Sequence, residues 1–117
     1  MTDVLIVDDE PPIVEFLSEL LTDEGYPVAK AYDGQEALEL IDDGLRPSLV
    51  IADLMMPRLT GAELAVALRA RQGPGAPPVA LMSANRGWID DVGGVVAKLP
   101  KPFAAEALVN LVRQYVH

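Results

Sequence analysis

Five short apolar runs recur along the chain, and amphipathic segments separate most of them. Most runs are unbroken rather than alternating with polar residues, which is typical of strands covered on both faces. Strands that alternate with helices are joined by crossovers, and such crossovers produce a parallel sheet. The pattern therefore predicts an α/β fold with five parallel strands. The runs cover Val4–Val7, the weaker Val28–Ala31, Leu49–Ala52, Val79–Met82 and Val95–Ala97.

Apolar residues at helical spacing, together with residues that begin or end helices, predict four helices between and after these runs. Pro11 and Pro12 begin the first helix, and Gly25 ends it. The apolar residues of this first helix are Ile13, Phe16, Leu17, Leu20 and Leu21. The last helix has its buried stripe at Leu108, Leu111, Val112 and Tyr115.

Two capping-box patterns mark the starts of the other helices. Asp33 with Glu36 precedes the second, which Gly44 closes, and Thr60 with Glu63 precedes the third. A further helix between residues 83 and 95 is doubtful, because three glycines leave little helical material there. We expect that helix to be short, distorted or partly mobile.

Composition limits the classes of protein to which the chain can belong. Its 117 residues suit one domain, residues 1–117, with one well-supplied core, since half of the residues are apolar. A net charge of −9 and the lack of a basic run argue against direct contact with nucleic acid. The absence of cysteine excludes disulfides and thiolate metal sites. No apolar stretch is long enough to span a bilayer, so we expect a cytoplasmic protein without membrane contact.

Residues that could bind a metal ion or take part in a reaction follow the predicted strands. Asp8 and Asp9 follow the first strand, Asp53 ends the third, Ser83 ends the fourth, and Lys101 follows the fifth. Parallel strands bring their carboxyl ends to one edge of the sheet, where ligands bind in open α/β folds. Carboxylates suit Mg²⁺, and an aspartate beside that ion can attack phosphorus. A lysine and a hydroxyl can hold the oxygens of a transferred phosphoryl group.

Each of these residues alone also has a structural explanation. Asp8 and Asp9 can favour the dipole of the first helix, and Ser83 can cap the next segment. Lys101 alone is typical of a surface charge, and Asp53 of a solvated strand end. Their shared position at one edge of the sheet favours a functional site, because the structural explanations do not require it.

Four motifs, in this order, resemble the receiver domain of bacterial two-component response regulators. The resemblance covers essentially the whole chain. It implies a flavodoxin-like, doubly wound sheet with strand order 2-1-3-4-5 and helices on both faces. The motifs are Val4-Leu5-Ile6-Val7-Asp8-Asp9-Glu10, Asp53-Leu54-Met55-Met56-Pro57 leading to Gly61, Ser83-Ala84, and Lys101-Pro102-Phe103.

The resemblance implies that Asp53 receives a phosphoryl group from the phosphohistidine of a sensor histidine kinase or phosphotransfer protein. Ser83 would donate a hydrogen bond to that group, and Lys101 would pair with it. The peptide between Lys101 and Pro102 would be cis, which aims the lysine inward.

The same resemblance implies a Mg²⁺ cofactor. Asp9 would bind the ion directly, Asp8 mainly through water, and Met55 through its backbone carbonyl, beside Asp53. Gly61 is expected to relieve crowding at the start of the third helix, with an ordinary turn glycine as the alternative.

Two departures from the family bear on signalling. Lys98 stands where the family usually carries Tyr or Phe, and a lysine cannot bury itself there without costly desolvation. The segment from Ser83 to Lys101 is also about one helical turn shorter than usual. Trp88 within it either fills a gap over the sheet or anchors a partner. Because the fourth helix is altered in this segment, we expect a monomer or a weak, phosphorylation-dependent dimer.

Three functions compete. The leading interpretation is a phosphorylation switch that acts on a downstream effector domain or protein and is not a turnover enzyme. The alternative is a constitutive interaction module that keeps the pocket but not the response, which Lys98 and the short fourth helix favour. A Mg²⁺-dependent phosphatase ranks third, since Leu54 and Met55 after Asp53 supply no separate acid or base.

Overall fold

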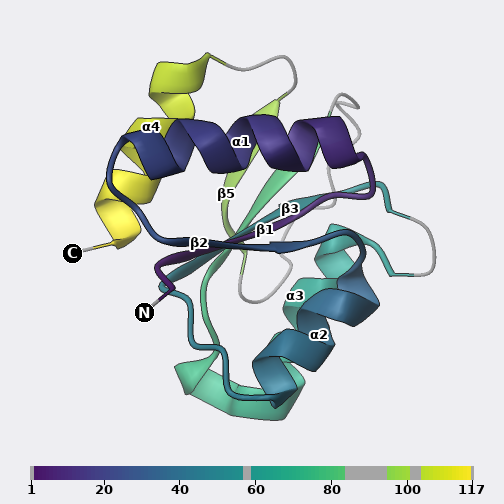
Figure 1. Ribbon diagram of the computed structural model, residues 1–117. Helices are drawn as coiled ribbons and strands as arrows, with labels where there is room; N and C mark the ends of the chain where they lie inside the picture. The colour runs from purple at the N-terminus through teal and green to yellow at the C-terminus, as the bar shows by residue number, and fades with distance from the viewer. Residues whose placement is uncertain (1, 57–58, 84–94, 101–103, 117) are drawn as a thin grey trace.

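The computed structural model describes residues 2–56, 59–83, 95–100 and 104–116. Within them, five parallel strands form one sheet in the order β2-β1-β3-β4-β5 (Figure 1). The predicted α/β fold, its parallel strands and their order are confirmed. The strands are β1 (Val4–Val7), β2 (Val28–Ala31), β3 (Leu49–Asp53), β4 (Val79–Ser83) and β5 (Val95–Pro100).

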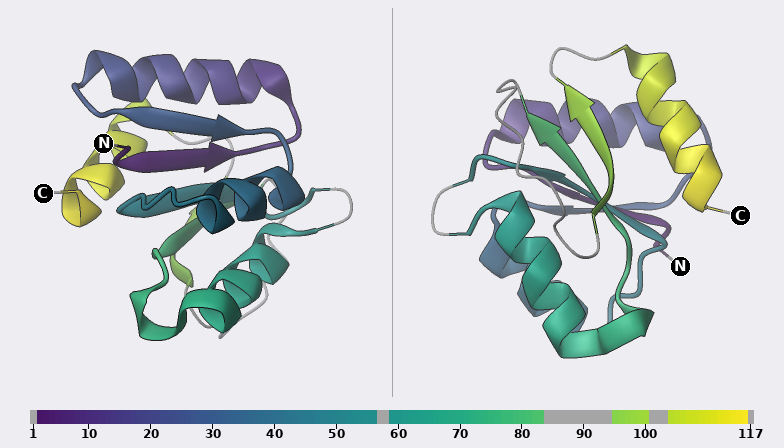
Figure 2. Two further views of the ribbon diagram at one scale, coloured as in Figure 1. Left: turned by 60° about the horizontal axis from the view of Figure 1, so that its bottom comes forward. Right: turned by 180° about the vertical axis from the view of Figure 1, so that it is seen from behind.

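Helices cover both faces of this sheet, as expected. Helices α1 and α4 lie on one face, and α2 and α3 lie on the other (Figures 1 and 2). A short 3₁₀ helix, η1 (Gly73–Gly75), follows α3. The doubtful helix between residues 83 and 95, with Trp88, lies outside the described residues. The α-helices are α1 (Pro11–Asp23), α2 (Gly34–Asp42), α3 (Gly61–Gln72) and α4 (Ala105–Tyr115).

The core consists of two clusters of buried residues, one on each side of the sheet. Alternate residues of a strand belong to opposite clusters: Leu5 packs with α2 and α3, whereas Ile6 packs with α1 and α4. All residues of β1, β3 and β4 are consequently buried, which explains their unbroken apolar sequence. Among the described helices, none is long and apolar enough to cross a membrane.

The predicted helix starts are also observed. The Asp33 side chain accepts a hydrogen bond of 2.7 Å from the backbone N–H of Glu36. Thr60 and Glu63 form a complete capping box, in which each side chain accepts from the backbone N–H of the other residue. Such a cap satisfies N–H groups that the first helical turn leaves without partners.

The apolar stripe of α1 differs from the prediction at one residue. Phe16 is 57% exposed, whereas Val14 and Ser18 are buried beside Leu17 and Leu21. A helix turns by about 100° per residue, so Phe16 points away from the line that Val14, Leu17 and Leu21 form. The apolar residues of α1 span a wider arc than the sheet can cover.

Strand β5 is an edge strand with a bulge. Val79 pairs with Val95 and Ala80 pairs with Ala97, so Val96 is an extra residue in the pairing. Such a residue bends the strand and increases its twist. Val96 is 43% exposed.

Candidate phosphorylation and metal site

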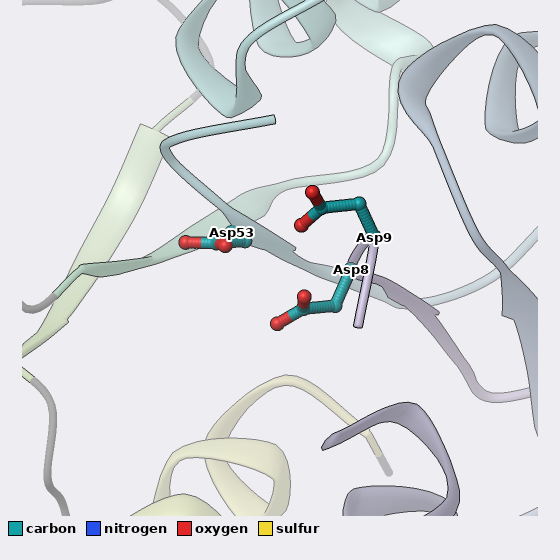
Figure 3. Close-up of side chains that lie close together, drawn as sticks. All are labelled: Asp8, Asp9 and Asp53. Carbon is teal, nitrogen blue, oxygen red and sulfur yellow. The ribbon is translucent and has the colours of Figure 1, made fainter. Parts of the chain in front are cut away.

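The carboxyl ends of β1 and β3 bring three aspartates together. Val7 at the end of β1 pairs with Ala52, so Asp8 and Asp53 follow at neighbouring positions on adjacent strands. One carboxylate oxygen each from Asp8, Asp9 and Asp53 lies within 4.8 Å of the others. Figure 3 shows the three side chains grouped at this edge of the sheet.

The three carboxylates differ in exposure. Asp8 is fully buried, Asp53 is 8% exposed, and Asp9 is exposed. Oδ1 of Asp8 accepts a hydrogen bond of 3.0 Å from the backbone N–H of Glu10. Burying carboxylates beside one another is costly, because like charges repel and lose hydration. A hard cation with oxygen ligands would offset that cost, so this donor set fits Mg²⁺.

The connection from β3 to α3 is held at both of its ends. The backbone N–H of Leu54 donates to the Met82 carbonyl at 2.8 Å, which continues the pairing of β3 with β4. The backbone N–H of Gly61 donates to the Leu54 carbonyl at 3.1 Å and closes the loop. Within it, the backbone N–H of Met55 lies 3.4 Å from Oδ1 of Asp53. The loop therefore contacts the Asp53 carboxylate directly.

Gly61 is the first residue of α3, and it packs against the main chain of Asp53. A β-carbon at position 61 would lie 2.6 Å from the Asp53 carbonyl oxygen and 2.7 Å from Cδ2 of Leu81. The predicted crowding is confirmed. The left-handed backbone of a turn glycine is found instead at Gly25 and Gly44, with φ of 93° and 114°.

The remaining candidates lie on β4 and beyond. Ser83 ends β4, one residue after the partner of Asp53 in the sheet, and is buried. Lys98 in β5 pairs with Leu81 and is exposed, which agrees with the expected cost of burying a lysine. Lys101 and its bond to Pro102 lie outside the described residues. The Met55 side chain is 62% exposed, and the ligand role of its carbonyl stays a prediction.

One polar cluster was not predicted from the sequence. Glu15 on α1 accepts hydrogen bonds of 3.0 Å from both Lys30 and Tyr32, at and just after β2. The hydrogen bond from Lys30, and then that from Tyr32, hold the pKa of Glu15 below its ordinary value. Glu15 in turn raises the pKa of Lys30 and of Tyr32. Residues so far apart in sequence give no local signal of this contact.

Comparison with characterised proteins identifies the family. Residues 4–113 match the family model described as the response regulator receiver domain. The chain is 37% identical over 117 residues to the transcriptional regulatory protein CpxR of Escherichia coli strain K12, covering 97% of this chain and 48% of CpxR. It is 40% identical over 114 residues to the response regulator MprA of Mycolicibacterium vanbaalenii, covering 94% of this chain and 48% of MprA. The chain thus spans about half the length of these relatives.

Solved structures give the same result. The response regulator TrrA of Thermotoga maritima, in complex with Mg²⁺ and BeF, superposes with a TM-score of 0.86 and 32% identity, covering 99% of this chain and 100% of that one. Chemotaxis protein CheY4 of Vibrio cholerae superposes with a TM-score of 0.85 and 31% identity, covering 99% of each chain. With its matched motifs, strand order and aspartate cluster, the chain belongs to the receiver domains of two-component response regulators.

Proposed function

We propose that Asp53 accepts a phosphoryl group from a phosphohistidine in a Mg²⁺-dependent reaction, and that the product changes partner binding. The donor is a sensor histidine kinase or a phosphotransfer protein. The observation that carries this proposal is the cluster of Asp8, Asp9 and Asp53 at the carboxyl ends of β1 and β3. Surface acids alone would not require two of three clustered carboxylates to be buried.

The aspartates have different roles in this reaction. A carboxylate oxygen of Asp53 attacks phosphorus, an O–P bond forms, and the P–N bond to the donor imidazole breaks. Asp9 would hold Mg²⁺ directly, Asp8 would hold it mainly through water, and the Met55 carbonyl would supply a further ligand. When bound, the ion supplies positive charge that neutralises the negative charge on the transferring oxygens.

Ser83 and Lys101 act on the phosphoryl group after transfer. The buried Ser83 ends the strand beside β3, so its hydroxyl is suited to donate to a phosphoryl oxygen on Asp53. Lys101 pairs with the same group through its ammonium. The added charge and acceptor oxygens draw both residues toward Asp53, and that shift changes the surface that partners bind.

Output requires a partner beyond these residues. We propose a cytoplasmic switch that acts on a downstream effector domain or protein, without turnover catalysis and without direct contact to nucleic acid. The relatives CpxR and MprA are about twice the length of the matched region, which supports an effector outside it. Oligomeric state is proposed as monomer or weak, phosphorylation-dependent dimer.

A constitutive interaction module remains the second candidate because of Lys98. The family usually has an aromatic ring at this position, which moves inward on phosphorylation, whereas Lys98 is an exposed cation. A charged head cannot follow the ring into an apolar site without losing its hydration. A response that depends on that movement would be lost while the acceptor site persists.

The test is to incubate the protein with Mg²⁺ and acetyl phosphate, then to measure intact mass and amide hydrogen exchange. We expect one added phosphoryl group and altered exchange in β4 and β5. Asp53→Asn should show neither, whereas Asp43→Asn, which removes an exposed acid after α2, should behave like the parent. An adduct without altered exchange supports the constitutive module. Sustained hydrolysis of unrelated phosphate esters refutes both in favour of a phosphatase.

A further inference from the structure

Position 61 leaves no room for a side chain. A β-carbon there would lie 2.6 Å from the carbonyl oxygen of Asp53, 3.1 Å from its carbonyl carbon and 2.7 Å from Cδ2 of Leu81. Real β-carbons essentially never approach other atoms closer than 3.0 Å. Gly61 has no left-handed backbone that would itself require glycine. The requirement at this position is space against the residue proposed to accept the phosphoryl group.

The two neighbouring atoms differ in how easily they can move. Cδ2 of Leu81 is the end of a flexible side chain, whereas the Asp53 oxygen belongs to a planar peptide. The N–H of that same peptide, on Leu54, donates to the Met82 carbonyl in β4. The Asp53 carbonyl therefore cannot retreat without disturbing the pairing of β3 with β4.

Gly61 also holds one end of the loop that connects β3 to α3. Its backbone N–H donates to the Leu54 carbonyl at 3.1 Å, which closes the loop that carries Met55. The Met55 backbone N–H lies 3.4 Å from Oδ1 of Asp53. A displacement at position 61 therefore acts on the Asp53 peptide and on the loop that contacts the Asp53 carboxylate.

We propose that Gly61 is a positioning residue for phosphoryl transfer. Without a side chain, α3 begins directly against the peptide that follows the acceptor and holds the Asp53 carboxylate in its reactive orientation. The role rests on the proposed function of Asp53. It adds that the start of α3, and not β3 alone, sets the geometry of the acceptor.

Four variants distinguish an effect on the position of Asp53 from an effect on core packing around Leu81. Gly61→Ala introduces both clashes, and Gly61→Ala with Leu81→Val removes Cδ2 and leaves only the clash with Asp53. Leu81→Val alone corrects for the one core carbon that this substitution removes. Gly75→Ala is the matched control, because a β-carbon there meets nothing within 4 Å and the backbone is not left-handed. The double variant keeps the test available if Gly61→Ala alone fails to fold.

The measurements are the thermal midpoint and the rate of phosphorylation by acetyl phosphate at saturating Mg²⁺. Gly61→Ala should lower both, the rate by at least about tenfold, because small misplacements of reacting groups have large kinetic effects. The double variant loses only the clash with Leu81, so it should recover part of the midpoint relative to Leu81→Val but not the rate, because the clash with the Asp53 oxygen remains. Gly75→Ala should match the parent in both. A parent rate in Gly61→Ala, or a rate restored together with the midpoint, would overturn the proposal.

A second readout distinguishes this inference from the proposed function. If the parent gains no phosphoryl group, the proposed function fails. The backbone amide chemical shifts of Leu54 and Met55 then test whether position 61 sets the geometry around Asp53. Gly61→Ala should move these resonances relative to the parent, and the double variant should move them relative to Leu81→Val, whereas Gly75→Ala should leave them unchanged. Unchanged resonances in the double variant would overturn the inference.

Discussion

Repulsion among the clustered aspartates should destabilise the protein without Mg²⁺, and Asp8→Asn tests this. Two unit charges 4.8 Å apart repel by about 3.5 kcal/mol at an effective dielectric constant of 20, and these oxygens lie within that distance. Asparagine keeps an oxygen that can accept from the Glu10 N–H. Removing the Asp8 charge gains less stability than this repulsion. Solvent surrounds the exposed Asp9, and the buried Asp8 has other interactions that the substitution would alter. We expect Asp8→Asn to stabilise the metal-free protein by about 1–2 kcal/mol.

Urea unfolding in EDTA and in excess Mg²⁺ provides the assay. In EDTA, the midpoint for Asp8→Asn should rise by about 1 M, since unfolding free energy falls by about 1–3 kcal/mol per molar urea. Mg²⁺ should stabilise the parent more than the variant, because the proposed site would hold the ion in the folded state through these carboxylates. Glu39→Gln removes one exposed negative charge from α2 and should change stability by less than about 0.5 kcal/mol.

Two results would refute this reasoning. If Asp8→Asn and the parent unfold at the same urea midpoint in EDTA, the carboxylates do not repel enough to affect folding. If Mg²⁺ stabilises both proteins equally, Asp8 does not contribute to the ion's site. A stabilised Glu39→Gln would instead indicate a general effect of the net charge of −9.

Two further predictions concern stability outside the site. Thr60→Ala should destabilise the protein by about 1 kcal/mol in urea unfolding, because it removes the cap on the Glu63 N–H; an unchanged midpoint would contradict the capping role. Glu15→Gln should lower the thermal midpoint at neutral pH, because the ordinary carboxyl pKa of 4.5 is lowered in the folded state by Lys30 and then by Tyr32. That contribution is present above pH 4.5 and disappears as the pH falls through the lowered value, so parent and variant should converge in acid; a constant difference would exclude the ionised contact.

The fold was largely predictable because its signals are local. An unbroken run such as Val4–Val7 can be covered on both faces only in a central strand, and it forms β1. Caps such as Thr60 with Glu63 act within one helical turn. Phe16 was misleading, since spacing shows which residues share a helix face but not how wide a face the sheet buries.

The site was predictable to the extent that topology determines it. Asp8 and Asp53 had to meet once parallel strands put their carboxyl ends at one edge, and the structure places them within 4.8 Å together with Asp9. The contact of Gly61 with the Asp53 carbonyl was foreseeable only as crowding, because its distance depends on how α3 packs. The bulge at Val96 has no signal in its own residue type.

The bulge in β5 also affects how copies of the chain can meet. A regular edge strand offers a row of backbone groups on which a strand from another molecule can add, and this is a common route to aggregation. Here the bulge at Val96 interrupts the regular spacing, and Lys98 places a charge on the same strand. At the opposite edge, β2 carries Lys30, held by Glu15. Both edges thus disfavour extension of the sheet by a strand from another molecule.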